Sequence, residues 1–543
     1  MKPRLDLGMD IGSVSINTVV LDAAGQVLYE DYRRTQGAPL PTALKILQEL
    51  AEQFGADAFR LAACTGIGGK VVAQTLGGVF VNEVIAQARG TFTFLPQART
   101  VIDMGGEDAK LILVDQDPQG SLIIVDFAMN TLCAAGTGSF LDQQSHRLGY
   151  RIEEFSQLAL KSTTPPRVAG RCSVFAKTDM IHLQQGATPD YEIIAGLCLA
   201  MARNLKSNIA KGKTIHKPVA FQGGVAHNLG VRQAFRTVFQ LADEELIIPP
   251  HFCSLGAIGA VQVARENPPA DFHLHIQALA DFLAQNQSEE RHHPPLQPPE
   301  LLTAAHYQVV ELAPEERAEG YLGIDVGSIS TNVVVIDPQM HVLAREYLMT
   351  AGRPLEAVTE GLRRIGAKFG DRLTILGAAT TGSGRYLTAD FIGADLVRNE
   401  ITAQATASAA INPNVDTIFE IGGQDSKFIA LENGAIVDFM MNKVCAAGTG
   451  SFLEEQAEKL GIAIREEFGA LALQSQKPVP LGERCTVFME SDLVHHQQHG
   501  AAKEDLVAGL AYSIVFNYLN KVKEERRVGD TVFYQGATAA NRG

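Results

Sequence analysis

Apolar, β-branched residues stand on both sides of Gly12-Ser13 in the stretch DLGMDIGSVSINTVVLDAAGQVL, residues 6–28. This pattern predicts a strand, a tight glycine turn and a second strand, with Ala23-Ala24-Gly25 as the next hairpin turn. A second turn, IDMGGED at 102–108, lies between an apolar run and LILVD. A third glycine turn follows the apolar run VAF at 219–221. Glycine turns therefore recur at the ends of predicted strands.

Helical spacing of apolar residues begins after two cysteines. GSFLDQQSHRLG (138–149) follows Cys133, and SVFAKTDMIHL (173–183) follows Cys172. The small-residue run SLGAIGAVQVA, at 254–264, has the close spacing of a helix packed tightly against a sheet.

These patterns occur twice in the same order. LGMDIGSVSINTVVLD (7–22) returns as LGIDVGSISTNVVVID (322–337), and NEVIAQA returns as NEITAQA. The string CAAGTGSFL occurs at 133–141 and again at 445–453. Because the shift stays between 312 and 317 residues, the chain is a tandem duplication.

The repeats predict a first unit over 1–266, a linker over 267–320 and a second unit over 321–543. The linker contains the proline clusters ENPPA and HHPPLQPPE and one predicted short helix, IQALADFLAQN. Asn228 is followed by about 40 more residues of its unit, whereas the matching Asn541 is followed by two. We therefore expect the second unit to be truncated at its C-terminal side.

Composition and charge exclude several classes of protein. The chain has 543 residues, of which 46% are hydrophobic and 20% charged, as in soluble globular proteins. Its net charge of -15 argues against nucleic acid or an anionic membrane surface as the main partner. The sequence shows neither a transmembrane run nor a signal-peptide segment, so we expect a cytoplasmic protein.

The glycine turns suggest phosphate binding. A Gly-Ser turn exposes backbone N–H groups that can hold phosphate oxygens, and an Asp at the adjoining strand end can hold hydrated Mg²⁺. A plain hairpin is the alternative for one such turn alone. A GxxxxGK[ST] motif is missing from the sequence, which excludes the P-loop class.

Four of the seven cysteines have a counterpart in the other repeat: Cys133 matches Cys445, and Cys172 matches Cys485. A thiolate that precedes a helix is stabilised by the helix dipole and free N–H groups. Two units together would supply four thiolates, which suit zinc or an iron–sulfur cluster. The spacing within each unit, 39 and 40 residues, fits a cluster that bridges the units better than a zinc site.

The three unmatched cysteines are expected to be small hydrophobic residues: Cys64, Cys198 and Cys253.

Two phosphate turns followed by a later Gly-Gly turn resemble the acetate kinase, sugar kinase, Hsp70 and actin superfamily. This resemblance implies an α/β fold in which each unit has two ribonuclease-H-like lobes that clasp ATP. In the first unit it implies phosphate turns made by Asp10, Gly12, Ser13, Asp103, Gly105 and Gly106, with Gln222, Gly223 and Gly224 beside the adenosine. The corresponding residues of the second unit are Asp325, Gly327, Ser328, Glu420, Gly422, Gly423, Gln424, Gln535 and Gly536.

The blocks CAAGTGSFL, GGQDSK, NEITAQA and RCTVF narrow the resemblance. They are similar to those of the 2-hydroxyacyl-CoA dehydratase activators, grouped with BadF/BadG/BcrA/BcrD-type ATPases such as those of benzoyl-CoA reductase. In that family a homodimer shares one [4Fe-4S] cluster, so Cys133, Cys172, Cys445 and Cys485 would hold it in a pseudo-dimer within one chain. The first unit departs from the family pattern with GGEDAK and NTLCAAG.

The resemblance implies that ATP hydrolysis drives one electron from a ferredoxin or flavodoxin through the cluster to an iron–sulfur dehydratase or reductase. Asp108 and Asp425 are candidates for sensing the γ-phosphate or positioning water. A sugar or acyl kinase-like phosphotransferase and a non-catalytic nucleotide-binding regulator are the alternatives.

Overall fold

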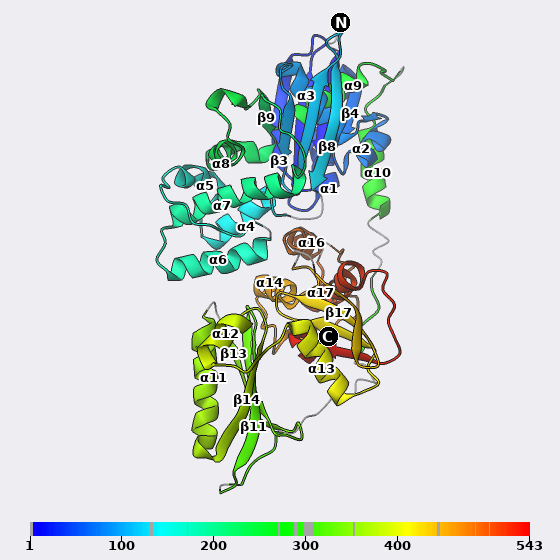
Figure 1. The fold of residues 1–543 in the computed structure, drawn as a ribbon. Coiled ribbons are helices and arrows are strands. Elements are labelled where there is room, and N and C mark those ends of the chain that lie inside the picture. The colour runs from blue at the N-terminus through cyan, green and yellow to red at the C-terminus, as the bar shows by residue number, and fades with distance from the viewer. Residues whose placement is uncertain are drawn as a thin grey trace. The chain divides into compact units, whose positions relative to one another are not determined.

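The computed structural model describes residues 4–543 apart from 131–133, 171, 270–271, 287–291, 298–308, 314, 351–352, 443–445, 484 and 499. The chain divides into two compact units (Figure 1). One unit contains residues 1–292 and 484–502, and the other contains 293–483 and 503–543. The two-unit architecture expected from the repeats is confirmed, although 484–502 groups with the first unit and not with its own repeat.

The first unit contains two mixed sheets with the same strand order. One sheet has the order β3-β2-β1-β4-β5, and the other has β8-β7-β6-β9-β10. The strands are β1 (Leu5–Ile11), β2 (Ser15–Leu21), β3 (Val27–Arg34), β4 (Phe59–Thr65), β5 (Val79–Phe80), β6 (Thr100–Met104), β7 (Ala109–Gln116), β8 (Leu122–Asn130), β9 (Val219–Gln222) and β10 (Leu246–Ile247). In each sheet the first three strands in chain order are antiparallel neighbours and the fourth is parallel to the first. This duplication of one sheet topology confirms the two-lobed α/β fold.

The helices of the first unit cover these sheets. They are α1 (Pro39–Phe54), α2 (Gly69–Leu76), α3 (Glu83–Phe94), α4 (Gly138–Arg147), α5 (Ile152–Ala159), α6 (Ser173–Gln185), α7 (Asp190–Asn204), α8 (Leu229–Phe239), α9 (Leu255–Ala264) and α10 (Ile276–Asn286), joined by α16 (Thr486–Gln498). Strand β1 is buried along its whole length because helices cover both of its faces.

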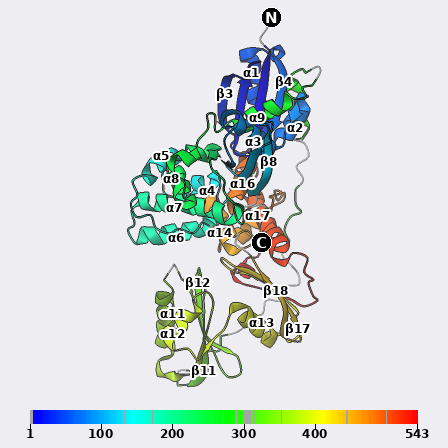
Figure 2. The ribbon, with the colours of Figure 1, turned by 45° about the horizontal axis from the view of Figure 1, so that its top comes forward.

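Helices α3 and α9, both labelled in Figures 1 and 2, pack against each other at very short distance. A Cβ atom on Gly259 would lie 1.8 Å from the Ala86 carbonyl oxygen, and one on Gly90 would lie 2.0 Å from that of Leu255. Only glycine fits at both positions. The small-residue run at 254–264 is therefore the tightly packed helix that the sequence predicts.

The second unit repeats the strand orders as β13-β12-β11-β14-β15 and β18-β17-β16-β19. Its strands are β11 (Ala318–Val326), β12 (Ser330–Ile336), β13 (Val342–Met349), β14 (Leu373–Thr381), β15 (Leu396–Val397), β16 (Thr417–Ile421), β17 (Ser426–Glu432), β18 (Ala435–Met441) and β19 (Val532–Gln535). Its helices are α11 (Pro354–Phe369), α12 (Arg385–Ile392), α13 (Glu400–Ile411), α14 (Gly450–Leu460), α15 (Phe468–Ala472) and α17 (Lys503–Tyr518).

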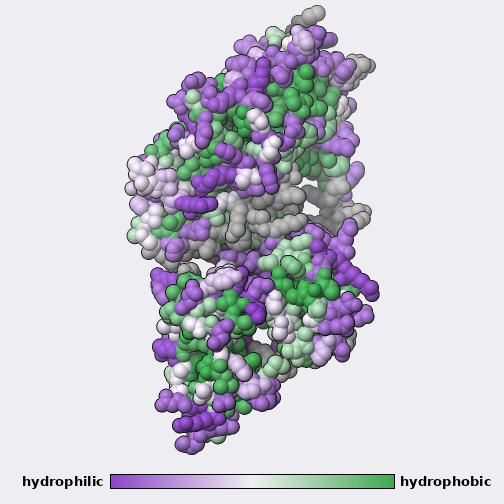
Figure 3. All heavy atoms as spheres, viewed as in Figure 1, coloured by the Kyte–Doolittle hydropathy of each residue, from purple (hydrophilic) through white to green (hydrophobic). Residues whose placement is uncertain are grey.

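Apolar side chains are more exposed in the second unit. Strand β14 exposes Ile375 and Leu376, whereas six of the seven residues of its counterpart β4 are buried beneath α9 and α2. The surface view shows hydrophobic groups among the polar ones on this unit (Figure 3).

The segment predicted as a linker contributes to a core. The predicted helix IQALADFLAQN is α10, and its Leu279 is fully buried in the cluster formed with α1 and α2. Strand β11 begins at Ala318, inside the range expected to be linker. Part of this proline-rich region therefore belongs structurally to the first unit.

Candidate functional site

Two glycine turns face each other in the first unit. The β1–β2 turn carries Asp10, Gly12 and Ser13, and the N–H of Gly12 donates to the Ser15 carbonyl at 3.0 Å. In the β6–β7 turn, the Gly105 N–H donates to the Asp108 carbonyl, also at 3.0 Å. A Cβ atom on Gly106 would lie 2.5 Å from Cβ of Val14, so the two turns are in contact. The structure thus brings together the two predicted phosphate turns.

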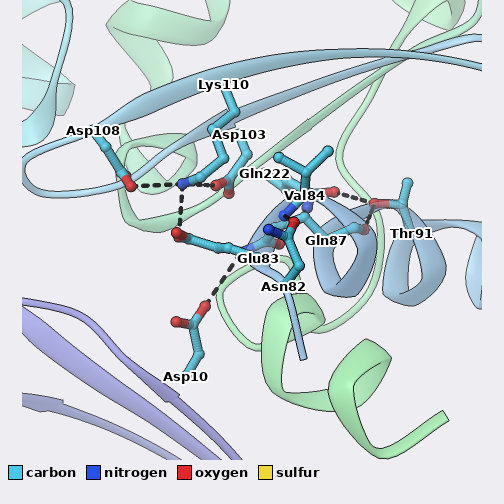
Figure 4. Close-up of polar contacts among 10 residues, drawn as sticks. All are labelled: Asp10, Asn82, Glu83, Val84, Gln87, Thr91, Asp103, Asp108, Lys110 and Gln222. Carbon is cyan, nitrogen blue, oxygen red and sulfur yellow. Dashed lines mark hydrogen bonds and ion pairs between the residues drawn. The ribbon is translucent and has the colours of Figure 1, made fainter. Parts of the chain in front are cut away.

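A buried lysine lies among three carboxylates beside these turns (Figure 4). The Lys110 ammonium nitrogen is 2.7 Å from Glu83, 2.7 Å from Asp108 and 3.3 Å from Asp103. Its side chain is fully buried. Burial alone would lower the pKa of Lys110, but the three carboxylates raise it well above its usual range.

The carboxylates carry more negative charge than one lysine balances. Burial, together with the charge of Glu83, raises the pKa of Asp10 well above its usual range. Burial also raises the pKa of Glu83 to about 7, although Lys110 opposes that shift. Oxygens of Glu83, Asp103 and Asp108 all lie within 4.8 Å of one another, a spacing that suits a metal ion, but the Lys110 ammonium is the cation that these three carboxylates share in this structure.

A chain of buried amides connects the two sheets across this cluster. Gln87 on α3 donates to Asp10 at 3.2 Å, and Gln222 at the end of β9 donates to Gln87 at 2.7 Å. The Thr91 hydroxyl donates to the Gln222 side chain at 2.5 Å (Figure 4). The side chain of Gln222, predicted to border adenosine, is thus completely buried within this chain of amides.

The turns open into a two-part cavity. Its inner part, about 90 Å³, is lined by Asp10, Gly12, Ser13, Glu83, Gln87, Asp103, Gly105, Gly106, Asp108, Gly223 and Gly224, among others. Its outer part, about 580 Å³, is lined by Tyr32, Arg34, Leu141, Asp142, Ile152, Ser156, Gln157, Gly224 and His227, among others. Both parts share Val14, Tyr32, Gly105, Gly106 and Gly224. This arrangement suits a ligand with a charged end and a larger end, as in a nucleoside triphosphate.

Helix α4 is tied directly to the second phosphate turn. The N–H of Gly138 donates to the Gly105 carbonyl at 2.9 Å, and the N–H of Ser139 donates to that of Gly106 at 2.8 Å. The second unit repeats this pair, with the N–H groups of Gly450 and Ser451 bonded to the carbonyls of Gly422 and Gly423 at 2.8 and 2.7 Å. A movement of the turn would therefore move the start of the helix that follows CAAGTG.

The second unit builds a related but simpler cluster. Lys427 lies 2.9 Å from both Glu400 and Glu420. Burial raises the pKa of Glu420 to about 7 and that of Asp325 to about 6. Gln535 joins the Gln404 amide at 2.5 Å, as Gln222 joins Gln87. The remaining predicted residues lie in the same turns: Gly327 and Ser328 follow β11, Gly422, Gly423, Gln424 and Asp425 lie between β16 and β17, and Gly536 follows β19.

Two of the four matched cysteines are described by the structure. Cys172 precedes α6 and Cys485 precedes α16, and both are buried free thiols. Burial raises the pKa of Cys485, and the nearby thiol of Cys172 raises it further. Hydrogen bonds from the backbone N–H groups of Phe488, Ala134 and Val487 lower this pKa but do not cancel the effect of burial. Thiols from the two repeats are therefore neighbours within the first compact unit. Cys133 and Cys445 lie outside the described residues.

The unmatched cysteines differ among themselves. Cys64 and Cys198 are buried among apolar residues, as predicted. Cys253 differs from its prediction, because it is only partly buried, lines the inner cavity and lies 3.3 Å from the His227 ring. The sequence around Cys253 does not predict this position, because it depends on how the loop before α9 packs against the turn before α8 that carries His227.

The sequence interpretation assigned no role to Lys110, Glu83 and Gln87. Each stands in a block shared by the repeats: Lys110 in GGEDAK and GGQDSK, Glu83 and Gln87 in NEVIAQA and NEITAQA. Their retention in both copies was the available signal.

Comparisons with known proteins agree with the duplicated architecture. A model described as the BadF/BadG/BcrA/BcrD ATPase family matches residues 7–264 and again 322–543. The (R)-2-hydroxyglutaryl-CoA dehydratase activating ATPase of Acidaminococcus fermentans is 33% identical over 226 residues, 41% of this chain and 84% of that protein. The activator of lactoyl-CoA dehydratase of Anaerotignum propionicum is 31% identical over 261 residues, 48% of this chain and 97% of that protein.

A solved structure, the activator of the 2-hydroxyisocaproyl-CoA dehydratase from Clostridium difficile with bound ADPNP, is 25% identical. The match covers 53% of this chain and 98% of that chain, with a TM-score of 0.42. Within the described part of the chain, every helix is too short or too polar to cross a membrane.

Proposed function

Because the chain belongs to the BadF/BadG/BcrA/BcrD ATPase family, we propose that it is an ATP-hydrolysing activase. It would reduce a partner iron–sulfur enzyme, a 2-hydroxyacyl-CoA dehydratase or a related reductase. Two relatives that activate such dehydratases each match about half of this chain and most of their own length. One chain would therefore carry both halves of the activator.

The observation that carries the proposal is the pair of hydrogen bonds between the second phosphate turn and the helix after CAAGTG, present in both units. A bound γ-phosphate that moved the turn would, through the bonded N–H groups, also move the start of α4 or α14. The cysteine at the start of each block lies five residues before its helix. Nucleotide state would thereby be coupled to the cysteine that begins each block.

The residues of the inner cavity fit Mg²⁺. It prefers carboxylate oxygens and retains several water ligands, so Asp10 and the three carboxylates that Lys110 partly neutralises would hold a hydrated ion at the cavity wall. A bound Mg²⁺ would neutralise charge on the phosphate oxygens. In hydrolysis, water forms the new bond to the γ-phosphorus while the bridging P–O bond breaks, releasing ADP and phosphate. Asp108, or Asp425 in the second unit, would orient that water.

The described cysteines fit an iron–sulfur cluster. Cys172 and Cys485 come from different repeats, are buried without a disulfide, and each precedes a helix. Cys133 and Cys445 would complete the ligand set. A [4Fe-4S] cluster held there would accept one electron from a ferredoxin or flavodoxin and release it to the partner enzyme.

Anaerobic purification tests this function. We expect a brown protein with about four irons per chain, ATP hydrolysis, and ATP-dependent reduction of an added iron–sulfur dehydratase in the presence of reduced ferredoxin or flavodoxin. An iron-free protein that phosphorylates a sugar or an acyl compound would instead support a kinase. An iron-free protein that binds ATP without turnover would support a nucleotide-binding regulator.

A further inference from the structure

Several positions that line the outer cavity of the first unit carry different side chains in the second unit. In the first unit, Tyr32 and Arg34 of β3 line the open cavity. Their counterparts on β13 are Tyr347 and Met349. The Arg465 guanidinium lies over the Tyr347 ring, 5.3 Å from its centre, and 3.6 Å from the Met349 sulfur. A cation therefore lies over one face of the ring that corresponds to a cavity wall in the first unit, and Tyr347 stays 37% exposed.

The arginine beside this position comes from a different element in each unit. In the first unit, Arg34 extends from β3 and pairs with Asp142 of α4 at 3.1 Å. In the second unit, Met349 takes the place of Arg34, and the positive charge comes from Arg465, in the segment before α15. The side chain of Arg465 thus reaches from the turn before α15 to β13, and its counterpart in the first unit, Ile152, lines the outer cavity.

Hydrogen-bonding groups around the outer cavity are also lost. Aligning EEFSQLAL (153–160) with EEFGALAL (466–473) replaces Ser156 by Gly469 and Gln157 by Ala470. His227 corresponds to Ala540 in the turns GGVAHN and GATAAN. A nucleoside is recognised by side-chain donors and acceptors at such positions, and a site without them binds it more weakly.

The inner parts of the two sites, in contrast, remain similar. Both units retain the phosphate turns, the buried lysine and the linked glutamines. The inner site thus keeps its main elements, whereas several side chains at the nucleoside positions are replaced.

We propose that the two nucleotide sites are unequal, and that Arg465 is the specificity-determining residue that closes the nucleoside part of the second site. The first unit binds adenine nucleotide tightly, while the second admits it only when Arg465 leaves Tyr347. This inference rests on the proposed ATPase function, because it concerns the same ligand.

The test is equilibrium titration of the anaerobic holoprotein with Mg²⁺ and the non-hydrolysable analogue ADPNP. We expect one tight site per chain in the wild type. Asp10→Ala should remove it, and Arg465→Ala should tighten the second site by roughly two- to fivefold, the size of one exposed cation–π contact. Arg363→Ala, an exposed arginine of the same unit paired with Glu360, is the matched control and should leave both affinities unchanged.

Arg465 is exposed, so its removal leaves the packed core intact, and thermal unfolding verifies this. Two equal tight sites in the wild type, or one tight site surviving in Asp10→Ala, would overturn the inference while leaving the ATPase function standing. An unchanged second site in Arg465→Ala would also overturn it. A wild-type protein that binds no ADPNP at all would contradict the ATPase function itself.

Discussion

Lys110 contributes a positive charge to the buried ionic cluster of the first unit, and substitution can test how that charge affects stability. It is fully buried, and its ammonium group is the cation nearest to three carboxylates in the described cluster. Removing one member of a buried ionic cluster leaves charges of one sign facing each other without compensation.

Lys110→Met should therefore lower the free energy of unfolding by about 3–5 kcal/mol in the absence of Mg²⁺, and Mg²⁺ should restore part of that loss. Thermal unfolding with EDTA and with Mg²⁺ measures both effects. Lys213→Met is the control, because Lys213 pairs with Asp126 at the surface and its loss should cost at most about 1 kcal/mol. Equal destabilisation of the two variants, or no response to Mg²⁺, would argue against a cation site here.

The cysteines give a second prediction at this scale. Cys172→Ser and Cys485→Ser should each reduce iron retention at least tenfold, since loss of even an outer-shell partner costs about 10–100-fold in metal affinity. Iron analysis after anaerobic gel filtration measures this. Cys64→Ala, in the apolar core of β4, is the control and should retain full iron. Iron loss in all three variants would mean that these thiols act through folding and not as ligands.

The sequence predicts where the two glycine turns lie, because glycine and acidic residues at the end of an apolar run indicate a turn locally. It does not reveal the Lys110 cluster or the Gln87–Gln222 bridge, because those contacts join β1, α3, β7 and β9 from distant parts of the chain. Nor does it predict that Gln222 turns inward from the third turn.

At the scale of elements, the packing of α3 against α9 holds the site residues of α3 in position. Helix α3 carries Glu83 and Gln87 on its first turns, and α9 fixes the position of that helix. A Cβ atom on Gly256 would lie 2.4 Å from the Asp10 carboxylate, so α9 also touches the first phosphate turn's acid.

Gly259→Ala should destabilise the first unit by about 1–3 kcal/mol and weaken nucleotide binding, because its Cβ would meet the Ala86 carbonyl. Gly366→Ala is the control, since Gly366 lies within α11 with open space around it, and this change should stabilise by about 0.5–1 kcal/mol. Urea unfolding and ADPNP titration distinguish the two. A Gly259→Ala protein as stable as the wild type would mean that the crossing can relax.

The helix at 254–264 and the helix within the linker are both predicted correctly from local spacing. The helices against which they pack are not predicted, because the packing of α9 on α3, and of α10 on α1 and α2, depends on the tertiary fold. The same reason explains why part of the predicted linker packs into a core.

At the scale of the molecule, both repeats belong to one polypeptide. In a homodimer, a shared metal site is lost when dilution separates the subunits. Here a covalent connection keeps the repeats at an effective concentration on the order of millimolar.

Iron content per chain should therefore stay constant when the holoprotein is diluted anaerobically from about 10 μM to about 10 nM, well below that effective concentration. Iron analysis of the protein recovered after equilibration at each dilution measures it. Cleavage of the chain within 298–308 by an inserted protease site provides the matched control, because dilution of the cleaved protein should then release iron. Iron loss from the intact chain on dilution would mean that the cluster is shared between different chains.

Joining the repeats also changes what mutation can do to them. In a protein assembled from two copies of one gene product, each substitution appears on both sides at once, so the sides stay alike. Here the repeats differ at equivalent positions, with Asp103 aligned with Glu420 and Arg34 aligned with Met349, because each repeat accumulates its own substitutions. Fusion therefore lets a substitution change one repeat without changing the other. Selection can then keep nucleotide turnover in one repeat and adapt the other to regulation or to binding a partner.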